Sequence, residues 1–191
     1  YLIYILNSYF KDVLKEPFKN YMEVGVLYGG SLCSLKLGGF EGKMYGLDLF
    51  QGYYGNYNNE SVFDKKPHEK SIDGHKKLVL DNIDMMDGSD VSVELIDGNT
   101  QKEGARDKYN KKSIPNKIDV LLIDGDHTKQ GALCDYKVLS PLVRDGGIIL
   151  FDNWEMGGVK DAVEEILKEF PGKLEKSGVF RDTTWIGINR V

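Results

Sequence analysis

The chain has 191 residues, of which 41% are hydrophobic and 29% are charged. This length suits one folded domain with a substantial core, and the composition excludes a disordered chain. The formal net charge of −5 excludes an overall basic surface, so we expect no nucleic acid and no membrane surface among its partners.

The chain opens with the apolar, aromatic run YLIYILNSYF. This run is too short to span a bilayer and lacks the basic flank and small-residue cleavage site of a secretion signal. We predict instead a short amphipathic helix over about residues 1–16 that packs on the domain. The two cysteines, Cys33 and Cys134, stand outside any CxxC motif. Their isolation favours a reduced, cytoplasmic protein.

Strand-like and helix-like segments then alternate along the chain. The predicted strands are 21–26, 43–49, 91–97, 118–124 and 147–152, and the predicted helices are 30–37, 73–85, 129–143 and 158–170. Two further strand-like runs, 173–180 and 183–191, are joined by a polar turn. This order predicts an α/β fold in a single domain, 1–191. It is Rossmann-like and doubly wound, with a mostly parallel seven-stranded sheet closed by an antiparallel C-terminal hairpin.

Acidic or amide residues stand at nearly every predicted strand end. In open α/β sheets the ligand crevice lies beyond the carboxyl ends of the strands. The residues at these ends are Glu23, Gly25, Asp48, Asp97, Gly98, Asp124, Asp152 and Asn153. Asp and Asn also cap helices, which explains one or two such positions. The whole set at one sheet edge indicates a ligand site.

The glycine-rich segment MEVGVLYGGSL follows the first predicted strand. A dinucleotide fingerprint would need GxGxxG, and Leu27 occupies the place of its second glycine. The dinucleotide-binding interpretation is therefore weak. The P-loop interpretation is weaker, because no Gly-Lys-Ser/Thr follows the glycines. The segment instead reads ExGxxxGxS, with Asp48 at the end of the second strand. This arrangement resembles the first two motifs of class I S-adenosylmethionine-dependent methyltransferases.

The resemblance implies a binding site for S-adenosylmethionine. In that family the glycine loop passes under the methionine portion, the carboxylate of the second strand accepts hydrogen bonds from the ribose hydroxyls, and the turn after the third strand holds the adenine. The positions that match are Glu23, Gly25, Gly29, Ser31, Asp48, Gly98, Asn99 and Thr100, and Asp124 is expected beside the cofactor as well.

Two later segments, LLIDGDH (121–127) and LFDNW (150–154), resemble the metal-dependent O-methyltransferases of the catechol and macrolide-sugar kinds. The likeness runs from about Met22 to Trp154. It implies that Asp124, Asp152 and Asn153 hold Mg²⁺ or another divalent cation. Oxygen ligands with positions left open to water and substrate are what a hard cation requires.

His127 is the expected general base, with Asp124 as the second catalytic residue. An imidazole is well matched to removing a proton from a metal-activated hydroxyl. His127 could instead cap the next helix or bind the metal, and Asp126 could orient His127 or a water molecule.

The polar insert over about residues 50–75 is predicted to be a lid, because its Tyr and Asn side chains suit a sugar ring; a plain surface loop is the alternative. Two histidines of the insert, His68 and His75, are expected to be solvated. Trp154 is expected either in the wall of the acceptor site or packed against the last helix.

Together these features predict a cation-dependent O-methyltransferase that acts on a hydroxyl of a small polar acceptor, with a sugar or glycosylated metabolite favoured over a catechol. A homo-oligomer formed through the N-terminal segment is also expected. The alternatives are an NAD(P)-dependent oxidoreductase on the same fold, a non-catalytic binding module, and a hydroxylase partner of the kind found among cephalosporin hydroxylase-like proteins.

Overall fold

The computed structural model describes residues 6–50, 71–109, 114 and 117–190, and the backbone of 56–57 and 60–61. Within these residues, seven strands form one sheet in the order β5-β2-β1-β6-β7-β9-β8. Neighbours from β5 to β7 pair in parallel, and β9 pairs antiparallel with both β7 and β8. The strands are β1 (Asn20–Val24), β2 (Lys43–Asp48), β5 (Ser92–Asp97), β6 (Ile118–Ile123), β7 (Val143–Phe151), β8 (Leu174–Phe180) and β9 (Thr184–Asn189). The predicted fold class is confirmed.

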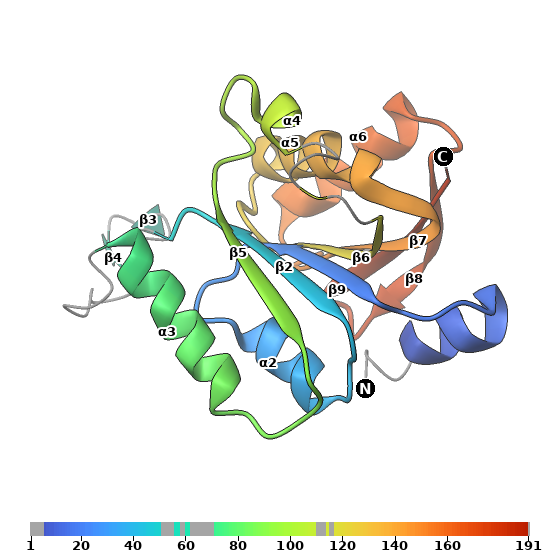
Figure 1. The fold of residues 1–191 in the computed structure, drawn as a ribbon. Coiled ribbons are helices and arrows are strands. Elements are labelled where there is room, and N and C mark those ends of the chain that lie inside the picture. The colour runs from blue at the N-terminus through green and yellow to red at the C-terminus, as the bar shows by residue number, and fades with distance from the viewer. Residues whose placement is uncertain are drawn as a thin grey trace.

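Helices cover both faces of the sheet (Figure 1). One face carries α2 (Gly30–Leu37), α3 (Ile72–Asp84) and the N-terminal π-helical segment Tyr9–Leu14. The other face carries the short α4 (Ala105–Lys108), α5 (Lys129–Leu139) and α6 (Gly157–Glu169). No helix in the described ranges is long and apolar enough to cross a membrane.

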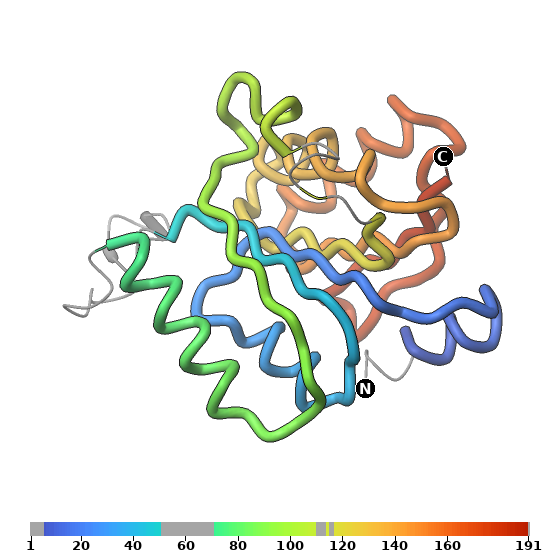
Figure 2. The backbone as a smooth tube through the Cα atoms, in the orientation of Figure 1, coloured from blue at the N-terminus to red at the C-terminus, as the bar shows by residue number. Residues whose placement is uncertain are grey.

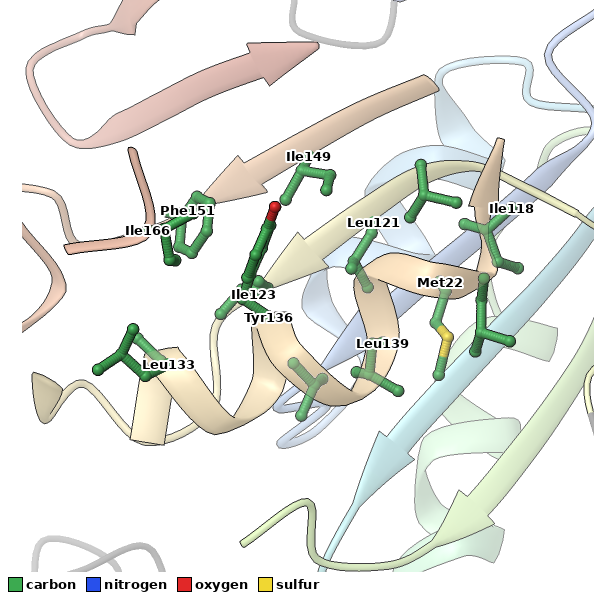
Figure 3. Packing of buried hydrophobic residues seen from close by; sticks show 14 of the residues in the cluster. Met22, Ile118, Leu121, Ile123, Leu133, Tyr136, Leu139, Ile149, Phe151 and Ile166 are labelled. Carbon is green, nitrogen blue, oxygen red and sulfur yellow. The ribbon is translucent and has the colours of Figure 1, made fainter. Parts of the chain in front are cut away.

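Strand β6 lies at the centre of the sheet and is buried along its whole length. A strand covered on both faces reads as a nearly continuous apolar run, which explains the sequence IDVLLI. Figure 3 shows Tyr136 and Leu139 of α5 packed over Leu121 and Ile123 of β6. This core holds the ends of the central strands in fixed positions.

The chain path creates a switch point at the centre of the sheet, as the trace in Figure 2 shows. From β1 the chain passes through α2 to β2 on one side, and from β6 it passes through α5 to β7 on the other. The carboxyl ends of β1 and β6 therefore diverge into helices on opposite faces. Ligands of open α/β sheets bind in this crevice.

Several boundaries differ from the sequence prediction. The helix predicted to reach residue 143 ends at Leu139, and Pro141 falls in a 3₁₀ turn over Ser140–Leu142, because proline cannot continue a helix interior. Strand β7 consequently begins at Val143 rather than at 147. Neither α4 nor the pair of two-residue strands β3 (Asn56–Tyr57) and β4 (Glu60–Ser61) was predicted.

Two predicted segments are described only in part. The N-terminal helix, expected over about 1–16, is helical from residue 6 to Leu14. The lid predicted for 50–75 falls mostly outside the described residues, although α3 already begins at Ile72.

Candidate active site

The loops that follow β1 and β6 touch at the switch point. Gly25 has a φ of +90°, and a Cβ atom added to it would lie 1.9 Å from the carbonyl oxygen of Asp124. Glycine is therefore required here by the neighbouring backbone as well as by its own conformation. The contact brings the predicted cofactor loop and the predicted catalytic loop into one site.

Glu23, at the end of β1, is fully buried. Its Oε2 accepts a hydrogen bond from the Tyr21 hydroxyl at 2.9 Å, whereas its Oε1 is buried without a hydrogen-bond partner among the described residues. Burial raises the pKa of the Glu23 carboxyl to about 8, and the hydrogen bonds from Tyr21 and Ser31 oppose the rise. A buried acceptor without a donor suits a cationic ligand group such as an ammonium.

Asp48, at the end of β2, is 4% exposed and binds the protein backbone. Its Oδ2 accepts the N–H groups of Val26 at 2.7 Å and Leu27 at 3.1 Å, and its Oδ1 accepts the N–H of Phe50 at 2.9 Å. Asp48 thus fixes the shape of the glycine-rich loop. Its contact with a ribose, expected from the sequence, stays a prediction.

The turn after β5 is held by contacts within the protein. A Cβ atom added to Gly98 would collide with the Tyr109 hydroxyl. The Asn99 side-chain oxygen accepts the backbone N–H of Gln101 at 2.8 Å, and the buried Thr100 donates its hydroxyl to Asp135. The residues predicted to contact adenine therefore also shape the turn that would receive it.

Asp135 is a buried acid that was not predicted to belong to the site. It is 2% exposed, and burial raises its pKa to about 7. Its Oδ2 has no hydrogen-bond partner among the described residues and lies 3.0 Å from where a Cβ atom of Gly125 would be. The sequence does contain a sign of its burial, because Asp135 stands in the apolar stripe of α5 with Ala132, Tyr136 and Leu139.

Asp124 and His127, the two residues predicted to be catalytic, lie side by side in the structure. The His127 Nε2 lies 3.1 Å from the Asp124 Oδ1. Burial raises the pKa of Asp124, the hydrogen bond from His127 opposes the rise, and the charge of Asp152 adds to it. The hydrogen bond to Asp124 raises the pKa of His127. Asp124 therefore orients the imidazole and stabilises its protonated form.

Asp126 lies on the same loop but makes other contacts. Its Oδ1 accepts the backbone N–H of Thr128 at 3.0 Å, and its Oδ2 accepts the side-chain amide of Gln101 at 2.9 Å. Thr128 is the N-cap of α5, and its side chain accepts the backbone N–H of Gly131. Asp126 thus links the β6 loop to the turn after β5, and the structure gives it no hydrogen bond to His127.

Asp152 and Asn153 follow β7, the neighbour of β6. The Thr184 hydroxyl donates to the Asp152 Oδ1 at 2.7 Å, and Asn153 has a φ of +56°, a conformation that Asn tolerates better than most residues. In the described ranges, no three His, Cys, Asp or Glu side chains gather into a metal-binding group. The candidate set is two carboxylates and one amide, and oxygen donors of this kind suit Mg²⁺.

The structure corrects the prediction for His75 and shows what Trp154 packs against. His75 was expected to be solvated, but it is fully buried on α3; the sequence could not show that its side of α3 faces the glycine-rich loop. Trp154 packs against Trp185 of the C-terminal hairpin, with 6.3 Å between ring centroids. His68 lies outside the described residues.

A family model described as a methyltransferase domain matches residues 22–154. This range begins in β1 and ends directly after Asn153, so it contains every predicted site residue. A stretch of 82 residues is 34% identical to the uncharacterized protein R132 of Acanthamoeba polyphaga mimivirus. That match covers 38% of this chain and 37% of the relative's length.

Solved methyltransferases have similar folds. The O-methyltransferase NovP gives a TM-score of 0.66 at 19% identity, over 100% of this chain and 80% of NovP. The calicheamicin methyltransferase CalS11 gives 0.61 at 17% identity, over 97% and 77% of the two chains. MycE, from the mycinamycin biosynthetic pathway, gives 0.57 at 17% identity, over 97% of this chain and 48% of MycE. At these identities the similarity establishes the fold.

Proposed function

This chain belongs to the methyltransferase domain family, and from that premise we propose that it is an S-adenosylmethionine-dependent O-methyltransferase. Its acceptor is the hydroxyl of a small polar molecule, and a divalent cation such as Mg²⁺ assists the transfer. The observation that carries the proposal is the hydrogen bond between His127 and Asp124, on a loop in direct contact with the glycine-rich loop at Gly25.

The residues at the end of β1 fit the cofactor. S-adenosylmethionine carries an ammonium and a sulfonium but no phosphate, so an acidic site suits it and a basic clamp would not. The buried Oε1 of Glu23 offers an acceptor for the ammonium. Asp48 and the turn at Gly98–Thr100 are assigned to the ribose and the adenine. The solved complex of MycE with Mg, S-adenosylhomocysteine and mycinamycin VI supports this cofactor by analogy.

Asp124, Asp152 and Asn153 are assigned to the cation. Asp124 and Asp152 follow adjacent parallel strands, and the negative charge of Asp152 repels that of Asp124 and so raises the pKa of Asp124. A cation between them would relieve that repulsion. When bound, the cation makes a nearby acceptor hydroxyl easier to deprotonate.

His127 receives the proton of the acceptor hydroxyl. With its Nε2–H donating to Asp124, its Nδ1 is the nitrogen that accepts the proton; this tautomer is assigned from the acceptor at Asp124. With S-adenosylmethionine bound, the hydroxyl oxygen would form the new C–O bond to the methyl carbon as the bond from that carbon to the sulfonium sulfur breaks. Asp124 stabilises the imidazolium that results.

A sugar or glycosylated metabolite is the favoured acceptor. One CalS11 structure is described as that of a TDP-rhamnose 3′-O-methyltransferase, and MycE was solved with the macrolide mycinamycin VI. The Tyr and Asn residues between positions 50 and 63 suit a sugar ring by composition. The oxidoreductase alternative loses support from the family match and from Leu27 at the place of a required glycine.

Calorimetric titration with S-adenosylhomocysteine and with NADH tests the cofactor. Binding of the first and not the second is expected, and the reverse result would replace the proposal with the oxidoreductase alternative. The acceptor class and the cation requirement are tested by methyl transfer to a panel of sugar nucleotides, glycosides and catechols, assayed with Mg²⁺ and with excess EDTA. Turnover that is equal in EDTA would remove the cation from the proposal.

A further inference from the structure

One face of α3 supplies side-chain donors to two successive carbonyl groups of the glycine-rich loop. The Nε2 of His75 lies 2.7 Å from the carbonyl oxygen of Leu27. The side-chain amide of Asn82 donates to the carbonyl oxygen of Tyr28 at 3.0 Å. Positions seven apart lie on the same face of an α-helix. The two donors therefore bind the loop side by side.

The same helix face also packs against the next loop residue. Val79 lies between the two donors in the sequence, and its Cγ1 is 3.0 Å from where a Cβ atom of Gly29 would be. Gly29 has a φ of +82° and directly precedes α2. Helix α3 thus contacts residues 27, 28 and 29 in succession, and we call its residues His75, Val79 and Asn82 the α3 brace.

The loop conformation needs such support. Leu27 has a φ of +48°, a left-handed conformation that is unfavourable for a residue with a Cβ atom. Its N–H donates to Asp48, and its carbonyl accepts from His75. Both backbone groups of a strained residue are therefore held, one by the end of β2 and the other by α3.

His75 is fixed in turn by its surroundings. It is fully buried, with its ring 5.7 Å from that of Tyr28 and edge-on to that of Phe50 at 5.5 Å. Because its Nε2 faces a carbonyl oxygen, this nitrogen carries the proton. A buried, oriented donor of this kind has a geometric role that a generic apolar side chain could not fill.

We propose that the α3 brace holds residues 27–29 in the conformation that receives the cofactor, and that His75 is its principal positioning residue. The inference rests on the proposed function, since it takes this loop as the site of S-adenosylmethionine. None of the three side chains is assigned to the reacting atoms, so their effect is on cofactor affinity.

The test compares His75→Phe, which keeps an aromatic ring without the donor, with His75→Gln, whose amide can still donate to Leu27. Calorimetry with S-adenosylhomocysteine is the main readout. His75→Phe should weaken binding about tenfold, since it leaves a buried carbonyl without a donor. His75→Gln should recover most of that loss. In turnover assays, His75→Phe should raise the KM for S-adenosylmethionine and leave the KM for the acceptor unchanged.

Two further variants keep the proposal testable even if His75→Phe does not fold. Asn82→Leu should weaken binding several-fold through the loss of one hydrogen bond. Lys77→Gln is the matched control, because Lys77 is exposed on α3 and pairs with Asp81 one turn further along the helix; it should bind like the wild type. Thermal unfolding of each variant confirms that the compared proteins are folded.

Folded His75→Phe and Asn82→Leu proteins that bind S-adenosylhomocysteine like the wild type would overturn the inference while leaving the proposed function in place. Equal losses for His75→Gln and His75→Phe would also overturn it, because shape rather than the donor would then matter. A wild-type protein that does not bind S-adenosylhomocysteine would overturn both the inference and the proposed function.

Discussion

The hydroxyl of Thr100 donates a hydrogen bond to the buried carboxyl of Asp135. This contact joins the turn after β5 to α5, the helix that follows the proposed catalytic loop, residues 124–127. A second contact, from Gln101 to Asp126, joins the same turn to that loop. The segment assigned to the adenine and the segment that carries His127 are therefore linked through side chains, and Asp135 is the buried member of the link.

Asp135 should make the protein less stable as the pH rises. Burial raises its pKa from 3.8 to about 7, so between these values the folded state keeps a proton that the unfolded state has released. Stability is then lost as the pH rises through this window. Asp135→Asn should already be more stable than the wild type at pH 5 and should exceed it further at pH 8, where the difference reaches at most about 4 kcal/mol at 1.36 kcal/mol per pKa unit.

Urea denaturation at the two pH values measures this difference. Asp161→Asn, on the exposed side of α6, is the control and should follow the pH dependence of the wild type. The same dependence in Asp135→Asn would mean that this carboxyl does not titrate in the window.

Replacing the proposed base should remove turnover and spare cofactor binding. His127→Asn should lower kcat by about 10²- to 10⁴-fold, the usual contribution of a general base. Stopped assays with S-adenosylmethionine and titration with S-adenosylhomocysteine measure the two effects. Lys129→Gln, an exposed position two residues further on, should behave like the wild type. Loss of binding in His127→Asn would assign this histidine to the cofactor instead.

Gly25 and Gly30 should respond in opposite ways to alanine. Gly25→Ala places a Cβ atom against the Asp124 carbonyl at a φ of +90°, which should cost about 1–3 kcal/mol or more of folding free energy. Gly30 begins α2 with no atom within 4 Å of the added Cβ, so Gly30→Ala should be neutral or stabilise by up to about 1 kcal/mol. Chemical denaturation of both variants checks the contrast, and similar values for the two would contradict the packing argument.

Thr184 should tune the proposed cation site. Its hydroxyl donates a hydrogen bond to the Asp152 Oδ1 at 2.7 Å and so orients this carboxylate. Thr184→Val should therefore weaken the apparent Mg²⁺ affinity about tenfold, the usual effect of removing a hydrogen-bond partner of a metal ligand. Activity titrated with Mg²⁺ measures this, and S-adenosylhomocysteine affinity should not change. Thr183→Val alters an exposed neighbour and serves as the control. An unchanged Mg²⁺ dependence in Thr184→Val would separate Asp152 from the cation.

The alternation of strands and helices could be predicted because each element carries its own pattern. The buried run of β6 and the acidic residues at the strand ends are local features, and the direction of parallel strands brings those ends together. The end of α5 was predicted too late because the apolar pattern continues past Pro141, where backbone chemistry stops the helix.

The surroundings of individual side chains could not be predicted in the same way. Burial of His75 depends on which side of α3 meets the glycine-rich loop, a property of the assembled sheet and not of the sequence around residue 75. The three backbone donors of Asp48 come from two different loops. Asp135 was within reach of the sequence, since an acid inside an apolar helical stripe is unusual.

The contact between Gly25 and the Asp124 carbonyl also limits how this protein could be rebuilt. A chimera that takes the β1 loop from one methyltransferase and the β6 loop from another would have to match two backbones at van der Waals distance. Exchange of the two loops as a pair should therefore yield folded hybrids more often than exchange of either loop alone. Directed changes of acceptor are better sought in segments outside this contact.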